Sequence, residues 1–214
     1  MNINAAEKRS AVPPVLVGIA GGSCSGKTTF ARLLQALLRP VKTGILNQDA
    51  YYRGQSSRDP DTRAKTNFDH PDAIEMPLFL SHLEKLLKGE SIRKPVYSYR
   101  LHTRTSETME VHPSKVLIVE GLFLFGMYPA APLFSLKIFL DVPDAERERR
   151  RVARDIQERS DTMEDLMIRW HGQTLPMHTS YVEPQKDFAD HVLTGVEDEA
   201  PPIAAEIEAI LKQR

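Results

Sequence analysis

Short hydrophobic runs alternate along the chain with segments whose hydrophobic residues recur at helical spacing. Strands that alternate with helices in this way are typical of an α/β domain with a mainly parallel sheet flanked by helices. The runs predict strands at Val15–Ala20, Gly44–Asn47, Val116–Val119, Lys137–Asp141 and His191–Leu193.

The helices are predicted where hydrophobic residues recur at helical spacing. After the first strand, hydrophobic residues from Phe30 to Leu38 follow a helical period, and Pro40 lies just beyond the last of them. A helix is therefore expected to end there, because proline cannot continue it. Further helices are predicted at Met76–Leu87, Asp144–Glu158, Met163–Trp170 and Pro202–Lys212.

Two long segments interrupt this alternation. Residues 51–72 are polar with little periodicity, and residues 91–113 alternate tyrosine with basic residues. Long irregular connections inside a compact domain are usually functional, so both are expected to be substrate-binding insertions. Residues 1–13 are predicted to form a loose tail, and residues 14–214 a single domain.

Composition narrows the classes of protein. Hydrophobic residues make up 41% of the chain, and 28 Lys and Arg nearly balance 29 Asp and Glu, so a globular domain without a general affinity for nucleic acid or membranes is expected. There is one cysteine, Cys24, which excludes an internal disulfide. No apolar run is long enough to span a bilayer or resembles a signal peptide, and these observations predict a cytoplasmic protein.

The residues after the first strand match the phosphate-binding pattern G-x-x-x-x-G-K-[ST]. Glycines let successive backbone N–H groups point at one phosphate, and the following helix adds the positive end of its dipole. Lys27 is expected to reach the β- and γ-phosphate oxygens of ATP, and the Thr28 hydroxyl to bind Mg²⁺. The alternative is a glycine-rich turn with a solvated lysine, which the strand before the motif and the helix after it argue against. The predicted ATP-binding residues are Gly21, Gly22, Ser23, Cys24, Ser25, Gly26, Lys27, Thr28 and Thr29.

Two acids follow predicted strands. Asp49 comes after Gly44–Asn47, and Glu120 comes after Val116–Val119. Ligands of open α/β sheets bind beyond the carboxyl ends of the strands, where phosphoryl transfer needs a base for the attacking hydroxyl and ligands for the metal. Asp49 is therefore predicted to be the general base and a metal partner, and Glu120 a metal partner. The alternative for each is an acid that caps a strand end or the next turn.

The helix predicted from Asp144 is rich in arginine. Arg147, Arg151 and Arg154 lie at i, i+4 and i+7 and should share one face. The alternative is a solvated helix with internal ion pairs. Because guanidinium groups match phosphoryl oxygens, Arg154 and Arg159 are instead predicted to close over the nucleotide phosphates, with residues 144–162 forming a lid.

Taken together, the motifs and their order resemble the uridine kinase (uridine–cytidine kinase) family over roughly residues 15–195. The segments that carry the resemblance are the phosphate-binding loop, Asn47–Tyr52, Asn67–Ala73, Pro95–Arg104, Val119–Gly121, Arg150–Ile156, Glu158–Arg159 and Glu183–Asp190.

The resemblance implies an ATP- and Mg²⁺-dependent kinase with a small β-hairpin beside the nucleoside pocket and an arginine-rich lid. It assigns the catalytic base to Asp49 and implies a homo-oligomer. It assigns nucleoside binding to Phe68, Asp69, Tyr97, His102 and Arg151. Tyr99 stands where the family usually has phenylalanine, which keeps a stacking surface.

Three positions depart from the family pattern. Ser98 replaces an aspartate, Asp161 replaces a substrate-contacting arginine, and Arg169 replaces a glutamine near the ribose. Because hydrogen-bonding sites reject wrong partners strongly, these changes leave other acceptors open: nicotinamide riboside, a sugar phosphate or pantothenate. The segments Phe68–Pro71 and His102–Arg104 favour uridine kinase over nicotinamide riboside kinase.

A nucleotide-binding switch without catalysis is the remaining alternative. The chain contains no Asn-Lys-x-Asp guanine-reading motif and no Asp-x-x-Gly switch sequence. A switch also has no need of a tyrosine-rich acceptor pocket, so a kinase is favoured.

Overall fold

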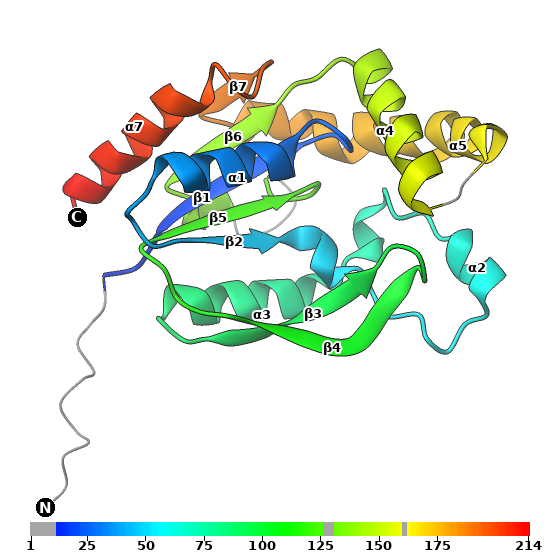
Figure 1. The fold of residues 1–214 in the computed structure, drawn as a ribbon, viewed down its shortest axis with the longest axis horizontal. Coiled ribbons are helices and arrows are strands. Elements are labelled where there is room, and N and C mark those ends of the chain that lie inside the picture. The colour runs from blue at the N-terminus through cyan, green and yellow to red at the C-terminus, as the bar shows by residue number, and fades with distance from the viewer. Residues whose placement is uncertain (1–11, 126–130, 160–161) are drawn as a thin grey trace, which may run out of the picture.

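The computed structural model describes residues 12–125, 131–159 and 162–214, without the side chains of residues 131, 158 and 159. Most of the tail predicted at residues 1–13 therefore lies outside the described part. The centre of the structure is a five-stranded parallel sheet in the order β2-β5-β1-β6-β7 (Figure 1). The strands are β1 (Val15–Gly21), β2 (Thr43–Asn47), β5 (Val116–Gly121), β6 (Leu136–Leu140) and β7 (His191–Leu193). All five predicted strands are confirmed to within two residues at each end.

Both faces of this sheet are covered. Alternate residues of β1 point to opposite sides: Val15, Val17 and Ile19 belong to one hydrophobic cluster, and Leu16 and Ala20 to the other. The first cluster packs under α1 (Lys27–Leu37) and α7 (Ala200–Lys212), and the second under α3 (Met76–Leu87). A sheet buried on both sides explains why most positions of its inner strands β1, β5 and β6 are hydrophobic.

The two predicted insertions lie together beyond the edge of the sheet, below β2 in Figure 1. Residues 91–113 form an antiparallel hairpin of β3 (Ile92–Ser98) and β4 (Thr103–Val111). Residues 51–72 contain the short helix α2 (Pro60–Ala64), whose N-cap Asp59 accepts a hydrogen bond from the Thr62 amide. Short 3-10 helices occur at Gln48–Tyr51, Pro71–Ala73 and Ala131–Leu133.

The arginine-rich segment forms α4 (Asp144–Arg159), and α5 (Met163–Arg169) follows it. The chain then stays helical as far as Phe188, through π-helical turns, α6 (Leu175–Met177) and a 3-10 turn at Glu183–Phe188. The sequence predicted this helix only to Trp170. Gly172, Pro176 and Pro184 are not expected inside a helix, although each proline is the second residue of an element, Leu175–Met177 or Glu183–Phe188. None of the described helices is long and apolar enough to cross a membrane.

Candidate functional site

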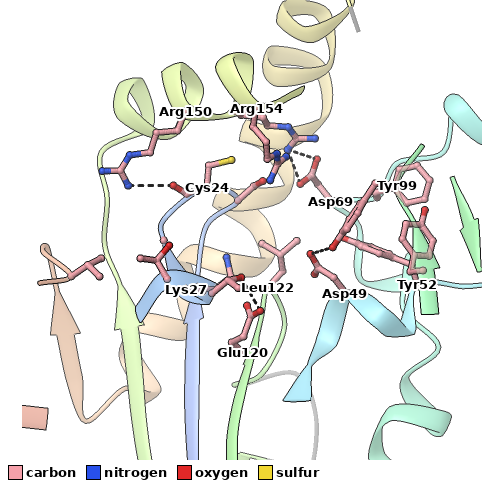
Figure 2. Close-up of a pocket in the computed structure, with 18 of the residues that line it drawn as sticks. Cys24, Lys27, Asp49, Tyr52, Asp69, Tyr99, Glu120, Leu122, Arg150 and Arg154 are labelled. Carbon is pink, nitrogen blue, oxygen red and sulfur yellow. Dashed lines mark hydrogen bonds and ion pairs between the residues drawn. The ribbon is translucent and has the colours of Figure 1, made fainter. Parts of the chain in front are cut away.

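A cavity of about 530 Å³ opens at the carboxyl ends of the sheet strands, between α4 and the β3–β4 hairpin (Figure 2). It brings together residues from seven separate segments. Of the predicted residues, its lining includes Ser23, Cys24, Gly26, Lys27, Thr28, Thr29, Asp49, Phe68, Asp69, Tyr97, Tyr99, His102, Glu120, Arg151 and Arg154. The cavity is also lined by residues that were not predicted from the sequence: Tyr52, Leu122, Arg150, Val196 and Glu197.

The loop between β1 and α1 has the backbone that its glycines predict. Gly26 caps α1 with a φ of 94°, and Cys24 also has a positive φ, of 61°. A Cβ on Gly22 would lie too close to the Arg147 guanidinium, so a larger residue there would force this buried side chain of α4 to move. The loop is thus held in shape by a helix that is distant in sequence.

Lys27 lies at the bottom of this loop. Its Nζ donates hydrogen bonds to the Gly21 carbonyl at 3.0 Å and to the Gly22 carbonyl at 2.8 Å. Burial lowers the pKa of Lys27, while the nearby carboxylates of Glu120 and Asp49 oppose that shift. The amine is therefore a buried cation beside two acids, in a position suited to binding anionic oxygens.

Glu120 ends β5 and is 2% exposed. It accepts hydrogen bonds from the Thr28 hydroxyl, at 2.9 Å, and from the Asn47 side-chain amide. Burial and then the charge of Asp49 raise the pKa of Glu120, while Lys27 and the two hydrogen bonds oppose the rise. Asn47 belongs to this cluster although the sequence analysis did not select it; its position at the end of β2, beside Glu120 in the register, was the available signal.

Asp49 lies in the 3-10 turn that follows β2. Gln48 fixes this turn: its side chain donates to the Phe123 carbonyl and accepts from the Phe123 amide. Asp49 faces the cavity, where its Oδ2 accepts a hydrogen bond of 3.0 Å from the Tyr99 hydroxyl (Figure 2). The sequence placed Asp49 near Glu120 correctly, because β2 and β5 are neighbours.

Asp69 forms the opposite side of the cavity. It is 8% exposed, pairs with Arg151 of α4 at 3.0 Å, and accepts a hydrogen bond of 2.8 Å from the Thr174 hydroxyl. Arg151 also lies 3.5 Å from Asp155, so its charge is balanced by two carboxylates. Thr174 was not predicted, since the helix that carries it was not.

An aromatic wall completes this side. Tyr52, Phe68 and Tyr97 meet with ring centroids 5.2–6.3 Å apart, and the His102 ring stacks on Phe68 at 5.6 Å. Burial, with Asp49 and Asp69 nearby, raises the pKa of Tyr52 well above its usual value, so its hydroxyl stays protonated. The wall offers aromatic rings and tyrosine hydroxyls to the cavity.

The arginines of α4 have different positions. Arg154 lines the cavity and pairs with Asp155 at 2.7 Å, whereas Arg149 is exposed and pairs with Glu146. Arg147 is fully buried, with its guanidinium 5.4 Å from the Trp170 ring centroid. It shares an inward face with Arg151, as predicted, but its guanidinium lies against Gly22 of the glycine loop.

Three positions that were named from the sequence are not among the described residues that line the cavity. The side chain of Arg159 and the whole of Asp161 fall outside the described residues. Arg169, expected beside the substrate, is not among the residues that line the cavity, and its Nε donates to the Asp165 carbonyl at 3.4 Å.

The cavity suits a nucleotide with Mg²⁺ on chemical grounds. The Thr28 hydroxyl and the carboxylates of Asp49 and Glu120 are the hard oxygen ligands that Mg²⁺ prefers, and Mg²⁺ commonly takes few protein ligands beside phosphate and water. In the same loop the Ser25 hydroxyl is buried without a hydrogen-bond partner. The described residues contain no cluster of three or more His, Cys, Asp or Glu side chains that would bind a metal unaided.

Comparison with known proteins agrees with this site. Residues 16–200 match the Phosphoribulokinase / Uridine kinase family. The chain is 42% identical over 182 residues to the uridine kinase of Leuconostoc citreum, covering 84% of this chain and 87% of that protein. It is 38% identical over 180 residues to the uridine kinase of Brevibacillus brevis, covering 84% of each. Phosphoribulokinase from Rhodobacter spheroides has the same fold, with a TM-score of 0.63 and 18% identity over 89% of this chain and 74% of that one.

Proposed function

The chain belongs to the phosphoribulokinase/uridine kinase family of ATP-dependent kinases, and from this membership we propose that it transfers the γ-phosphoryl group of ATP to the 5′-hydroxyl of uridine or cytidine. The observation that carries the proposal is the division of one cavity into a phosphate half, around Lys27, and an aromatic half, around Phe68. The carboxylate of Asp49 lies between them.

The phosphate half supports transfer from ATP. Lys27 would leave the two carbonyls that it now contacts and bind the β- and γ-phosphate oxygens. Arg154 would approach them from α4, where it already lines the cavity. Planar guanidinium groups suit the spread of negative charge over the transferred oxygens.

We assign Mg²⁺ to the cluster of Thr28, Glu120 and Asp49. Bound there, the ion would neutralise charge on the phosphate oxygens. The Thr28 hydroxyl is held by Glu120 at 2.9 Å, which fixes its orientation. Burial of Glu120 strengthens its attraction for a cation, because its charge has little solvent around it.

The aromatic half supports a nucleoside acceptor. The rings of Tyr97, Phe68 and His102 provide a stacking surface for a base, and Asp69 can accept hydrogen bonds from two ribose hydroxyls. Such an arrangement directs the 5′-hydroxyl toward Asp49, which would take its proton as the oxygen attacks the γ-phosphorus.

An acceptor panel tests the proposal. The protein is incubated with Mg²⁺–ATP and, separately, uridine, cytidine, nicotinamide riboside, a sugar phosphate and pantothenate, and the phosphorylated products are identified by mass spectrometry. Turnover of uridine or cytidine is expected. Turnover of another acceptor, with both pyrimidine nucleosides inert, would contradict it.

The role of Asp49 is tested separately. Asp49→Asn should still bind ATP but lose about 10²–10⁴-fold in turnover, the usual contribution of a general base. Isothermal titration with ATP and a coupled assay measure the two quantities. Near-normal turnover would assign the base elsewhere.

Two further properties complete the proposal. We propose a homo-oligomer, as the resemblance implies, and light scattering of the purified protein checks it. We also propose a cytoplasmic location, where ATP is abundant, which fractionation of the producing cell checks.

A further inference from the structure

We infer that Tyr99 is a positioning residue for the catalytic carboxylate, which it holds through its hydroxyl. This inference rests on the proposed role of Asp49 as the general base. Its basis is the hydrogen bond of 3.0 Å from the Tyr99 hydroxyl to Asp49 Oδ2.

The bond joins two elements that are distant in the sequence, and it adds to the hydrogen bond from Arg104 of β4 to the Tyr51 carbonyl. Asp49 belongs to the turn after β2 of the central sheet, whereas Tyr99 directly follows β3 of the hairpin, which forms a sheet of its own. The two residues are 50 positions apart in the sequence. The hairpin therefore reaches across the cavity to the carboxylate at the end of the neighbouring sheet (Figure 2).

The Tyr99 ring is held in place by its neighbours. It meets Tyr97 edge-on, with centroids 5.3 Å apart and an interplanar angle of 77°, and Tyr97 in turn packs at 5.2 Å from Tyr52. Because these rings are supported by one another, the hydroxyl is presented at a fixed place although the ring is 39% exposed. A hydrogen bond from a positioned donor restricts rotation of the carboxylate more than one from water does.

The consequence is a fixed orientation of the carboxylate. The bond at Oδ2 also sets where Oδ1 lies relative to the hydroxyl of the acceptor. Tyr99 also lines the acceptor half of the cavity, so the residue that contacts the acceptor and the residue that aligns the base are the same. Correct seating of the hairpin and correct alignment of the base are thereby linked.

Tyr99→Phe tests the inference, because it removes the hydroxyl and keeps the ring. We expect kcat with uridine to fall about tenfold and KM for uridine and for ATP to change less than about twofold, the pattern of a lost alignment rather than lost binding. A role confined to ring packing would leave kcat unchanged. Tyr181→Phe is the matched control: its hydroxyl contacts His70 at 3.2 Å outside the cavity, and kcat should not change.

A double-mutant cycle shows whether Tyr99 acts through Asp49. If it does, adding Tyr99→Phe to Asp49→Asn should cause no further loss of kcat. If the two residues act independently, the fold-losses of the two single variants should multiply in the double variant. Multiplying losses, a raised KM alone or an unchanged kcat would each overturn the inference. Near-normal turnover of Asp49→Asn would instead overturn the assignment of the base itself, so the two failures are distinguishable. If the panel identifies another acceptor, the same variants are compared with that acceptor.

Discussion

The phosphate half and the acceptor half of the cavity are built in opposite ways. The phosphate half comes mainly from one continuous segment, Gly21–Thr29, whose position follows from β1 before it and α1 after it. The acceptor half is assembled from the turn after β2, the segment of Phe68 and Asp69, the hairpin and α4. A site made by one segment tolerates changes elsewhere, whereas a site made by four depends on how they pack. The two halves should therefore respond differently to substitution.

Lys27→Ala should have the largest effect. It removes the buried cation of the phosphate half, and we expect kcat to fall at least about 10³-fold, the upper range for loss of one electrostatic contact to the reacting group. The loss should be the same for every acceptor that is turned over. Steady-state assays with two acceptors measure it, with Lys212→Ala on α7 as an exposed control. A fall in kcat that differed between acceptors would contradict the division of the cavity into a phosphate half and an acceptor half.

Glu120→Gln should separate activity from stability. Turnover is expected to fall about 100-fold, within the range for a metal-site contact in phosphoryl transfer. Burial raises the pKa of Glu120, which means that its charged form is unfavourable in the folded protein. The wild type thus carries a cost near neutral pH that the variant lacks, so the variant should melt at a higher temperature there.

The raised pKa of Glu120 also predicts how the difference in melting temperature between Glu120→Gln and the wild type depends on pH. As pH falls through the raised pKa toward the usual value of 4.5, the wild-type carboxyl becomes protonated in both states and the difference should vanish. Melting curves across this range check it. A variant that melts lower at neutral pH would mean that the hydrogen bonds from Thr28 and Asn47 outweigh the burial of the charge.

Asp69→Asn should affect only the acceptor half. It weakens the contacts to Arg151 and removes a charge that is expected to bind two hydroxyls, so KM for the acceptor should rise about 30-fold, in line with loss of charged hydrogen bonds. KM for ATP should stay within twofold, roughly the scatter of such assays. Asp72→Asn is the matched control, since its side chain is 92% exposed. A parallel rise in the KM for ATP would show that the halves are coupled through α4.

Ser25→Ala should have the smallest effect. The Ser25 hydroxyl is buried without a partner, a situation that costs about 1–3 kcal/mol, so its removal should leave the nucleotide-free protein equally stable or slightly more so. If the hydroxyl binds phosphate, the rise in melting temperature produced by ATP should shrink. Thermal melts with and without ATP measure both. An unchanged shift would mean that the hydroxyl has no part in binding.

The contrast between the halves also explains what the sequence could reveal. Hydrophobic runs gave all five strands because a parallel sheet is buried on both faces, and the glycine loop was visible because its residues are contiguous. Asp49 and Glu120 could be predicted because each follows a strand, and ligands of open α/β sheets bind beyond the carboxyl ends of the strands. The acceptor residues Phe68, Asp69 and His102 were assigned by resemblance alone, since nothing local shows that they will meet.

What stayed hidden depended on packing. The structural role of Arg147 follows from its contact with Gly22, and that of Thr174 from its bond to Asp69. Neither contact has a signature in spacing. The helical run after Trp170 was masked by a glycine and two prolines that the fold accommodates at turn boundaries.

The two carbonyl contacts of Lys27 have a consequence for selectivity. Any anion that draws the ammonium group away must replace both the Gly21 and the Gly22 oxygens. A single orthophosphate offers little beyond what it displaces, whereas a polyphosphate chain can bind the ammonium group and the loop amides together. The loop should therefore discriminate between phosphate ligands by the length of the phosphate chain, and bind a triphosphate much more tightly than free phosphate.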